Sequence, residues 1–446
     1  MIAEEEHKEI SRITDCLGYP SGPQEGLDLE AMEFFIRSQL LKMGAEILER
    51  YINERLAVTD APVCTNNHLP ATMKSTGTRP KTLRTILGPV RTHRRRYQCP
   101  ICHRVCFPAD ALLGVGKGRF SPGLQRMMAH VGAAGPFAKG SEDLHLLAHV
   151  EVDAKDVERT AEKVGDEVDA WMQSESGRAR LLAAAGKPTV REAPKRLYVS
   201  FDGTGVPMMG EALEGRVGKN GPAKTREVKV GCIFTQTTVN NEGLAVRDEA
   251  STSYVAAIEE SRDFGHRIHG EAIRRGLKQA DDITVLTDGQ AYNMSIVKEH
   301  LPQARHIVDV QHAKDHLTDF VCNVALEKVG GRWHQEAEQI LLEGCIEDLM
   351  EMIRKRLPRS GPRRKRGQKE IHYFEGNKER MRYAAFRAEG CFIGSGVVEA
   401  ACRIVVGQRL KNSGMFWSMR GANSIMALRC AILSNRFEDF WENRAA

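Results

Sequence analysis

The spacing of apolar residues predicts helices in the first part of the chain. Between residues 29 and 57 they recur every three or four positions, which is typical of an amphipathic helix that packs or dimerises; they are Met32, Phe35, Ile36, Leu40, Met43, Ile47, Leu48 and Tyr51. Two short strands are expected around Gly88-Pro89, followed by helices near 138–149 and 154–172. These two helices indicate either a DNA-binding helix-turn-helix or an ordinary helical hairpin. The acidic side chains of the second helix support the hairpin alternative.

From about residue 191 the pattern changes to β character. The segment LYVSFDG alternates, with Leu197, Val199 and Phe201 on one face of a strand. Further strands are expected at 226–236, 283–290 and 304–310, and a helix at 257–277. Strands in hairpin-like succession followed by strands alternating with helices predict an α/β fold, a mixed sheet flanked by helices. The Gly-rich run 203–221 lacks phosphate-loop spacing and is expected to be a mobile hairpin.

The length and composition of the chain limit the kinds of protein it can be. With 446 residues, 41% of them hydrophobic and 28% charged, the chain can form two or three ordinary cores. Its acidic start, MIAEEEHKEISRITD, does not resemble a signal peptide, and no apolar run approaches ~18 residues. We therefore expect a cytoplasmic protein without a membrane segment.

Charge is concentrated in two basic segments, although the net charge of +5 is modest. One spans 91–97 and the other spans 354–369. Segments of this kind are usually flexible and solvated, and in the cytoplasm the polyanion they most often meet is nucleic acid. The predicted DNA-binding residues here are Arg94, Arg95, Arg96, Arg363, Arg364, Lys365 and Arg366.

Four of the eleven cysteines are clustered in the sequence. Cys99 and Cys102 form a knuckle typical of zinc sites, and Cys64 and His68 lie upstream, so a Cys₃His zinc site is one interpretation. Cys106 or His103 could complete the site instead, and a degenerate ribbon held by packing alone is the alternative. The other seven are expected to be buried thiols that behave as small hydrophobes: Cys16, Cys232, Cys322, Cys345, Cys391, Cys402 and Cys430.

Three acidic residues are candidates for catalysis. Asp202 and Asp288 each close an apolar strand and precede a glycine, so both carboxylates should stand at strand ends where the backbone turns away. A plain Asp-Gly turn would explain either one alone. Glu399 lies in an apolar helical stretch after a Gly-Ser-Gly segment, where a bare carboxylate would be costly. An ion pair with Arg403 is the structural alternative.

Three carboxylates from two strand ends and one helix suit a two-metal phosphoryl-transfer site. Oxygen ligands favour Mg²⁺ or Mn²⁺, which activate the attacking oxygen and stabilise the leaving one.

The stretch between Asp288 and Glu399 is too long for one crossover in a compact sheet. It predicts an all-helical insertion, with helices in 313–357 and 371–389 and a basic DNA-facing loop at 354–369.

A family resemblance adds to these patterns over residues 60 to 443. It rests on the segments SFDGTGVPM, REVKVG, LTDGQAYN, HIVDVQHAKDHL, RMRYAAFRAEGCFIGSGVVEAACR and GQRLKNSGMFWSMRGANSIMALR. Together they resemble the insertion-sequence transposases of the ISKra-four family, a DDE group with an RNase H-like core. The resemblance implies that Asp202, Asp288 and Glu399 are the catalytic triad.

The same resemblance assigns Asp309 and His312 to active-site support. An Asp at a strand end and a His on the first helical turn could orient DNA or the scissile phosphate. The competing interpretations are a zinc pair formed by His312 and His316, and a His316 that is merely solvated.

Near the C-terminus, Ser418 is expected to cap one long helix that runs through Trp441. Arg409, Lys411 and Arg420 are candidates for phosphate contacts. Phe416 and Trp417 could stack on DNA bases, with core packing as the alternative.

These observations predict a DDE transposase that binds the terminal inverted repeats of an insertion sequence and performs metal-dependent cleavage and strand transfer. Its partners would be double-stranded DNA, as transposon ends and target, and further copies of the chain in a dimer or higher oligomer. The rival functions are a nuclease or resolvase of the same fold and a transposase-derived DNA-binding regulator without activity.

The expected parts are an N-terminal helical segment (1–60), a zinc-ribbon-like module (61–112), a helical DNA-binding region (113–190), a first catalytic part (191–324), a helical insertion (325–390) and a second catalytic part (391–446).

Overall fold

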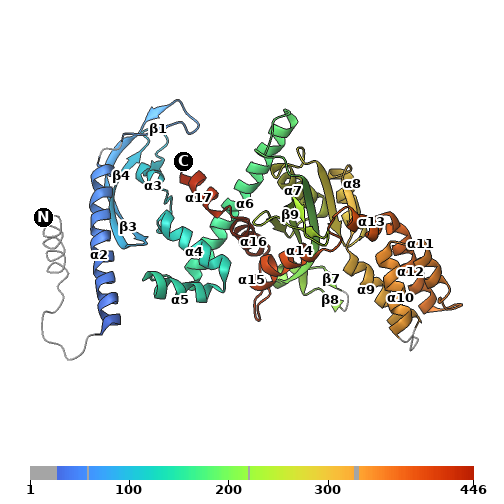
Figure 1. Cartoon of the computed structure of the whole chain (residues 1–446). Helices are drawn as coiled ribbons and strands as arrows, with labels where there is room; N and C mark the ends of the chain where they lie inside the picture. Colours follow the sequence, from blue (N-terminus) through green and yellow to red (C-terminus); the bar gives the residue numbers. More distant parts are fainter. Residues whose placement is uncertain (1–27, 58–59, 219–220, 326–330, 446) are drawn as a thin grey trace, which may run out of the picture. The chain divides into compact units, whose positions relative to one another are not determined.

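The computed structural model describes residues 28–57, 60–218, 221–325 and 331–445. The chain forms two compact units, one up to Thr160 and one from Ala161 to Arg444 (Figure 1). The boundary lies inside one long helix, α6 (Ala154–Ala184).

The first unit is built around a long β-hairpin and a helix. Helix α2 (Leu29–Leu56) begins after Asp28, whose side chain accepts a hydrogen bond from Ala31 N, so the expected helix is present, although its apolar residues are not confined to one face. The hairpin strands β3 (Lys74–Thr85) and β4 (Gly88–Gln98) are much longer than the short strands predicted. Three short strands complete the β structure, β1 (Val63–Cys64), β2 (Ala71–Thr72) and β5 (Val105–Cys106).

Side chains of α2 hydrogen-bond to the backbone of β4. Arg91 N donates to the Glu49 carboxylate, while the Asn53 side-chain amide donates to Arg91 O and accepts from His93 N. Only the last residues of β4 pair with β5, so these contacts satisfy backbone groups on a strand edge that lacks a neighbouring strand.

The rest of this unit is helical. The helices are α3 (Pro108–Leu112), α4 (Pro122–Ala134), α5 (Phe137–Ala148) and the start of α6. Leu124, Met128, Leu144 and Val157 form their shared apolar cluster. Helices α5 and α6 occupy the two predicted positions, but α6 continues well beyond the predicted end at 172. Whether they act as a helix-turn-helix on DNA stays a prediction.

The second unit contains a five-stranded mixed sheet with the strand order β12-β9-β6-β13-β14. Strand β9 is antiparallel to its neighbours β6 and β12, whereas β13 is parallel to both β6 and β14. The bounds are β6 (Arg196–Pro207), β9 (Thr225–Gln236), β12 (Ser253–Ala257), β13 (Asp282–Thr287) and β14 (Arg305–Val308). The predicted mixed sheet flanked by helices is therefore confirmed.

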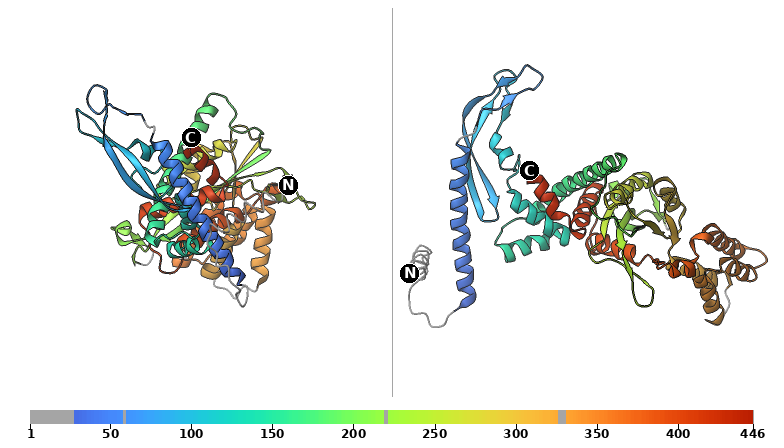
Figure 2. Two further views of the ribbon diagram at one scale, coloured as in Figure 1. Left: turned by 90° about the vertical axis from the view of Figure 1, so that its left-hand side faces the viewer. Right: turned by 45° about the horizontal axis from the view of Figure 1, so that its top comes forward.

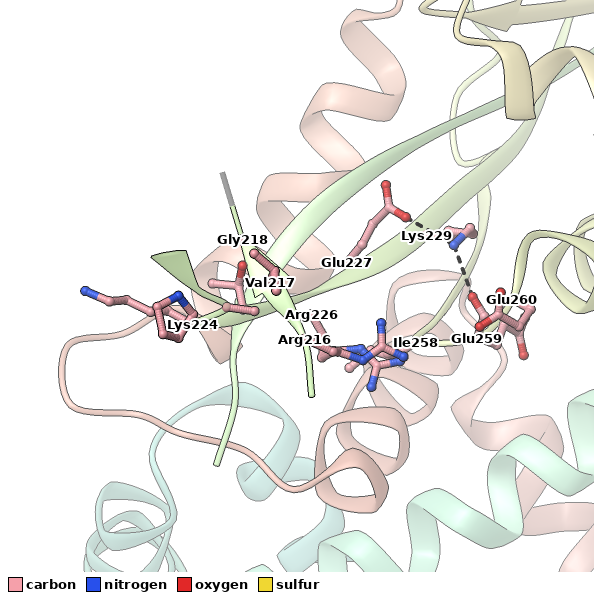
Figure 3. Close-up of a pocket in the computed structure, with 13 residues that line it drawn as sticks. Arg216, Val217, Gly218, Lys224, Arg226, Glu227, Lys229, Ile258, Glu259 and Glu260 are labelled. Carbon is pink, nitrogen blue, oxygen red and sulfur yellow. Dashed lines mark hydrogen bonds and ion pairs between the residues drawn. The ribbon is translucent and has the colours of Figure 1, made fainter. Parts of the chain in front are cut away.

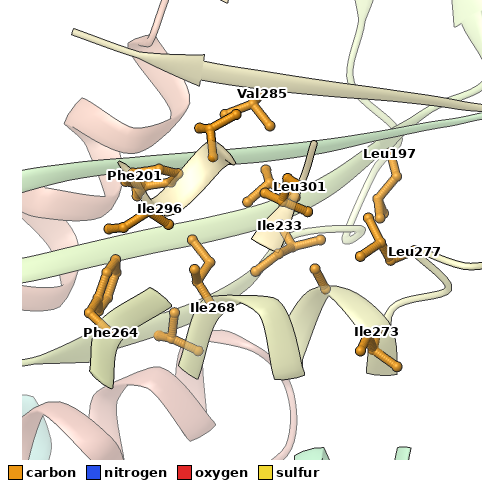
Figure 4. Close-up of a cluster of buried hydrophobic side chains, with 14 of the residues drawn as sticks. Leu197, Phe201, Ile233, Phe264, Ile268, Ile273, Leu277, Val285, Ile296 and Leu301 are labelled. Atoms are coloured by element: carbon orange, nitrogen blue, oxygen red, sulfur yellow. The ribbon is translucent and has the colours of Figure 1, made fainter. Parts of the chain in front are cut away.

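Helices α7 (Ser261–Arg274) and α8 (Ala291–His300) cover one face of this sheet. Alternating strand residues such as Leu197, Phe201 and Ile233 meet Phe264 and Ile268 in the main core (Figure 4). This is the face that the alternation in LYVSFDG predicted.

The opposite face carries aromatic residues and the C-terminal helices. Tyr198 stacks on Phe234, and Phe392 meets both rings edge-on. The elements that contact strands on this side are α14 (Gly396–Ala401), η4 (Cys402–Gly407) and α16 (Met419–Leu433), and the remaining C-terminal helices are α15 (Gln408–Leu410) and α17 (Phe437–Ala445). The single C-terminal helix predicted was wrong, because α16 ends before Asn435, whose φ is 55°, and α17 starts afresh; Ser418 does cap α16.

The expected helical insertion lies between β14 and α14, where α10, α11 and α12 pack together (Figures 1 and 2). Its elements are α9 (Val310–Phe320), η2 (Val321–Ala325), α10 (Gly331–Glu343), α11 (Ile346–Arg354), α12 (Pro362–Asn377), η3 (Lys378–Arg380) and α13 (Tyr383–Ala388). The basic segment was predicted to be a loop, but α12 begins inside it. Only residues 355–361 connect the helices there.

The Gly-rich run after Asp202 forms regular structure over its described residues. Strand β6 continues to Pro207, and short elements follow: η1 (Gly210–Leu213), β7 (Val217–Gly218) and β8 (Gly221–Pro222). Another small hairpin joins β10 (Thr238–Val239) to β11 (Ala245–Val246).

The described cysteines differ in their exposure to solvent. Of the cysteines expected to be buried, Cys322 and Cys345 are exposed, so that prediction was wrong for both, and Cys16 lies outside the described residues. None of the described helices is both long and apolar enough to cross a membrane.

Helix α6 offers a matched test of the packing in the second unit. A Cβ added to Gly165 would lie 2.2 Å from Ser424 O on α16, whereas nothing lies within 4 Å of a Cβ at Gly177. Gly165→Ala should therefore lower the free energy of unfolding by about 1–3 kcal/mol. Gly177→Ala should raise it by about 0.5–1 kcal/mol, because alanine restricts the unfolded chain. Denaturant unfolding of both variants measures this, and equal effects would contradict the close contact.

Candidate active site and metal centre

The strand register places Asp202 and Asp288 at the same level of neighbouring strands. The last parallel pair between β6 and β13 is Ser200 with Leu286, and each aspartate lies two residues further on. Since adjacent strands run about 4.8 Å apart, the two backbones are neighbours at this edge of the sheet. Asp202 and Asp288, which are remote from each other in the sequence, therefore lie at the same edge of the sheet.

Asp202 belongs to the sheet face opposite the main core. It has the same strand parity as Tyr198 and Ser200, whereas Phe201 points into the core. The prediction that the strand ends here was wrong. Strand β6 continues past Gly203 because it stays paired with β9, in the register Asp202 with Val230.

Asp288 starts a turn and is held there. Its Oδ1 accepts hydrogen bonds from Gln290 N at 2.9 Å and from the Asn293 side-chain amide at 2.6 Å, and only 5% of the residue is exposed. Gly289 has a φ of 80°, which favours glycine. The turn proposed as the alternative explanation of this Asp-Gly pair is therefore present, and it fixes the carboxylate rather than leaving it free.

Glu399 lies on α14, and its environment differs from the prediction. The side chain was expected to be costly to bury, but the residue is exposed. Its Oε1 accepts a hydrogen bond from Ser395 Oγ at 2.9 Å. Among the described residues, no ion pair joins it to Arg403, so that alternative is not realised.

The electrostatics of Asp202 link the three carboxylates. Burial raises the pKa of Asp202, and the negative charges of Asp288 and Glu399 raise it further. The N–H of Gly203 and the His312 imidazole act in the opposite direction. The three acids therefore lie close enough to repel one another, which is a charge distribution that a cation would relieve.

The three carboxylates are not drawn together to ligand distance. Among the described residues, the groups whose metal-ligating atoms all lie within 4.8 Å of one another are Cys64–His68–Cys99–Cys102 and His266–Glu299–His300. Each acid is instead hydrogen-bonded to a group of its own segment, as described above. Rotation of these side chains would be needed for one ion to contact all three.

Asp309 and His312 do come together. Asp309 follows β14, and the pair Thr287 with Val308 sets it level with Asp288. His312 Nδ1 and Asp309 Oδ2 are 2.7 Å apart. The hydrogen bond to Asp309 raises the pKa of His312 to about 9, with smaller contributions from the other carboxylates. His312 is therefore a cation at neutral pH beside the acidic cluster.

The zinc pair of His312 and His316 does not form. His316 Nδ1 is 2.6 Å from Glu370 Oε2, and its ring stacks on Tyr373 with the centroids 3.6 Å apart. This also excludes a merely solvated His316. Tyr373 in turn donates a hydrogen bond to Asp288 O at 3.2 Å, so the insertion contacts the edge of the sheet.

Sequence reasoning missed two residues around these acids. Asn293 is fully buried and holds Asp288, and Ser395 contacts both Asp309, through its N–H, and Glu399, through its hydroxyl. Both lie in the segments that carry the family resemblance, LTDGQAYN and CFIGSGVVE. Their spacing of five and four residues from an acid was the available signal.

The four predicted metal ligands in the first unit converge. His68 Nε2 lies 3.6 Å from Cys64 Sγ and 3.4 Å from both Cys99 Sγ and Cys102 Sγ, and the Cys64 and Cys102 sulfurs are 3.7 Å apart. For tetrahedral ligands at ordinary bond lengths of about 2.3 Å to sulfur and 2.0 Å to nitrogen, we calculate ligand separations of about 3.8 and 3.5 Å. The cluster thus has the dimensions of a tetrahedral metal site.

Groups around this cluster favour its metal-binding form. The His68 Nδ1 is 2.6 Å from Leu69 O, which leaves Nε2 facing the thiols. Hydrogen bonds from the backbone N–H of Arg104 and from His68 lower the pKa of Cys102 to about 6. Cys106 instead contacts Met73, and neither it nor His103 belongs to the group.

The predicted DNA-binding residues differ in their accessibility. Arg94 is bound to Asp110 at 2.6 Å and covers the Phe107 ring, whereas Arg95 is exposed. Arg96 donates to Thr76 Oγ1. On α12, Arg364 is partly buried, and the other three predicted cations are exposed, namely Arg363, Lys365 and Arg366.

Two residues near the C-terminus are buried, which does not fit their predicted contacts with DNA. Arg409 is fully buried with its guanidinium over the Trp417 ring, and burial lowers its pKa to about 10. Trp417 donates to Leu410 O, so the core-packing alternative describes it. Lys411 remains exposed and donates to Thr204 Oγ1 at 2.6 Å, two residues after Asp202. Phe416 is also exposed.

A pocket of about 560 Å³ lies beside the first residues of β9 and the segment 258–260 that follows β12 (Figure 3). Arg216, Lys224 and Arg226 line it together with acids, and Lys229 Nζ bridges Glu227 Oε2 and Glu259 O at 3.2 and 3.1 Å. None of the three catalytic candidates lines it.

Comparisons with known proteins add little. No protein-family description matches the chain, and no curated protein matches its sequence. One similar solved chain comes from the "Drosophila P element transposase strand transfer complex", with 11% identity, 74% of this chain and 83% of that chain covered, and a TM-score of 0.26. A structural overlap this low establishes neither a shared fold nor a shared activity.

The titration of His312 tests the Asp309 contact. In the wild-type protein we expect a pKa of about 9, and in Asp309→Asn a pKa much closer to the ordinary 6.5, because the largest contribution is gone. A pH titration of the imidazole signals by NMR measures both, with His312→Gln to assign the resonance.

Stability should follow the same titration. Because the folded pKa of His312 is raised, its contribution is fully present below pH 6.5 and is lost as the pH rises through about 9. The denaturant midpoint of the wild type should fall more steeply across this window than that of His312→Gln. Equal slopes would contradict the ion pair.

Proposed function

We propose that this protein is a DDE transposase, which cleaves DNA at the ends of an insertion sequence and joins the ends to target DNA. The observation that carries the proposal is the level placement of Asp202 and Asp288 on adjacent parallel strands. Glu399 contributes to the same local field, since its charge raises the pKa of Asp202.

The topology of the sheet supports an RNase H-like core. Numbered in chain order, its five strands lie in the order three-two-one-four-five, and the second is antiparallel to the others. This is the arrangement of RNase H-like proteins, in which the first and fourth strands carry neighbouring acids. Here those strands are β6 and β13.

The donor set fits divalent metal ions. Three carboxylates that repel one another offer hard oxygen ligands, which suit Mg²⁺ or Mn²⁺. When bound, such ions would activate the attacking oxygen and neutralise charge on the phosphate. Asp202, Asp288 and Glu399 would hold them, while Asn293 keeps Asp288 oriented.

His312 and Asp309 would act as positioning residues. The buried Asp309 fixes the His312 ring through Nδ1, which leaves Nε2 as the donor available to a phosphate oxygen. Since His312 is charged at neutral pH, it would attract the DNA backbone toward the acids.

DNA would be held by the exposed cations. Lys411 lies beside Thr204 and so beside the catalytic edge. The first turns of α12 present Arg363, Lys365 and Arg366 to solvent, and Arg95 is exposed on β4. Contacts of this kind go mainly to phosphates and position double-stranded DNA without selecting its sequence.

We further propose that the Cys/His cluster holds zinc in a zinc-ribbon-like module. The three thiols and one imidazole have the spacing and the ligand chemistry of a closed structural zinc site. Such a site would order the turns between β1 and β2 and between β4 and β5.

Replacing one catalytic acid tests the reaction. Asp288→Asn should lower Mg²⁺-dependent cleavage of DNA carrying the flanking element ends by about 1,000-fold, the effect of losing several kcal/mol of metal-derived stabilisation. DNA binding should persist. Asp315→Asn, at an exposed position on α9, is the matched control and should retain cleavage.

The same assay separates the rival functions. Strand-transfer products from a pre-cleaved end distinguish a transposase from a nuclease or resolvase. If wild type and Asp288→Asn bind the DNA equally and neither cleaves it, the result favours the catalytically inactive regulator. Unchanged cleavage by Asp288→Asn rejects the proposed site.

Zinc content tests the second proposal. The purified wild-type protein should contain one equivalent of zinc, measured by elemental analysis. Cys102→Ser should lose it, because a hydroxyl replaces a thiolate ligand. Cys106→Ser is the control, since Cys106 lies outside the ligand group, and it should keep the metal. Equal zinc contents in the two variants would contradict the assignment.

A further inference from the structure

Helix α2 has two apolar sides, and among the described residues of the unit only one of them packs on other elements. The side that contains Ala45 and Leu56 packs on the β3–β4 hairpin (Figure 2). For example, a Cβ at Gly44 would lie 3.4 Å from Leu87, and Ala45 Cβ lies 3.7 Å from the Cβ position of Gly88.

The opposite side of α2 carries a second apolar stripe. Ile36, Leu40 and Ile47 are 41%, 50% and 67% exposed, and the partly exposed Met43 lies between them. Their spacing of four, three and four residues is that of a coiled-coil seam. On a helix of 3.6 residues per turn, this stripe points away from Ala45.

The ends of the stripe carry opposite charges. One step before Ile36 in the same pattern stands Glu33, and one step after Ile47 stands Arg50, both exposed. The stripe therefore runs from an acid through four apolar residues to a base. Only an antiparallel copy of the same stripe matches both ends.

We infer that α2 pairs with α2 of a second copy of this chain in an antiparallel, two-fold symmetric coiled coil. In this register Leu40 faces Met43 of the partner subunit and Ile36 faces Ile47 of the partner subunit. Glu33 then meets Arg50 of the partner subunit, at both ends of the interface. An isologous contact of this kind closes as a dimer and does not propagate.

This dimer differs from a parallel one in its charges. In a parallel pair Glu33 would face its own copy and so would Arg50, which places like charges together twice. The charge pattern therefore selects the antiparallel register over the parallel one. The inference does not depend on the proposed catalysis, and a protein with Asp288→Asn should dimerise like the wild type.

A charge swap in the full-length protein tests the pairing. Sedimentation equilibrium without DNA should show a concentration-dependent dimer for the wild type. Glu33→Arg and Arg50→Glu should each raise the dimer dissociation constant by roughly tenfold, because two attractive pairs become repulsive. The double variant should restore wild-type affinity, since it exchanges the partners without changing the pairing.

A second variant keeps the test independent of charge. Ile47→Glu should abolish the dimer without affecting the fold, because the side chain is already 67% exposed. Leu181→Glu, at a position 75% exposed on α6, is the control and should dimerise normally. Circular dichroism confirms that each variant is folded.

Three results would overturn the inference. A wild type that stays monomeric at all concentrations would show that the stripe serves another occupant, including other parts of the same chain. A dimer insensitive to Ile47→Glu would place the contact elsewhere. A double charge swap that fails to recover affinity would reject the antiparallel register.

Discussion

The proposed site depends on the hydrogen bonds that hold the buried carboxylate of Asp309. It has no exposed surface and accepts four hydrogen bonds, from Gln311 N, Ser395 N, His312 N and His312 Nδ1. A buried charge is tolerated only when such donors replace its lost hydration. Because Ser395 lies 86 positions away in the chain, this one side chain joins the end of β14 to the start of α14. The helical insertion can therefore leave and return to the sheet without displacing Glu399, and Tyr383, which donates to Val308 O, holds its last helix against the same strand.

Much of the sheet could be predicted from the sequence, because each strand has its own local pattern. The alternation in β6 and the apolar runs of β9, β13 and β14 were sufficient to place them within a few residues. The order and the register of the strands could not be predicted, since strand pairing depends on contacts between remote segments. The error at Gly203 has this cause. An Asp-Gly pair favours a turn locally, but the backbone of β9 supplies partners as far as Pro207 and keeps the strand extended.

Side-chain burial was the less predictable property of the site. Arg409 looked like a phosphate ligand because arginines are usually exposed, yet the Trp417 ring covers it and core packing surrounds it. Glu399 looked buried because its neighbours are apolar, yet α14 is short and turns this position outward. In both cases the decisive contact comes from tertiary structure, which a local pattern does not encode. The cysteine cluster was more predictable, since the spacing of Cys99 and Cys102 alone favours a knuckle.

The two proposed metal sites differ in how far the protein chain alone assembles them. In the Cys/His cluster the thiols and the imidazole hydrogen-bond to one another, and the contact with His68 helps to lower the pKa of Cys102 to about 6, so the tetrahedral spacing is reached without a cation. In the carboxylate group, burial raises the pKa of Asp202 and the charges of Asp288 and Glu399 raise it further, and each acid is hydrogen-bonded to its own segment instead. Assembly of such a site is coupled to the arrival of cations and of the phosphate that shares them. Under the proposed function, this coupling would restrict the closed geometry to the DNA-bound state.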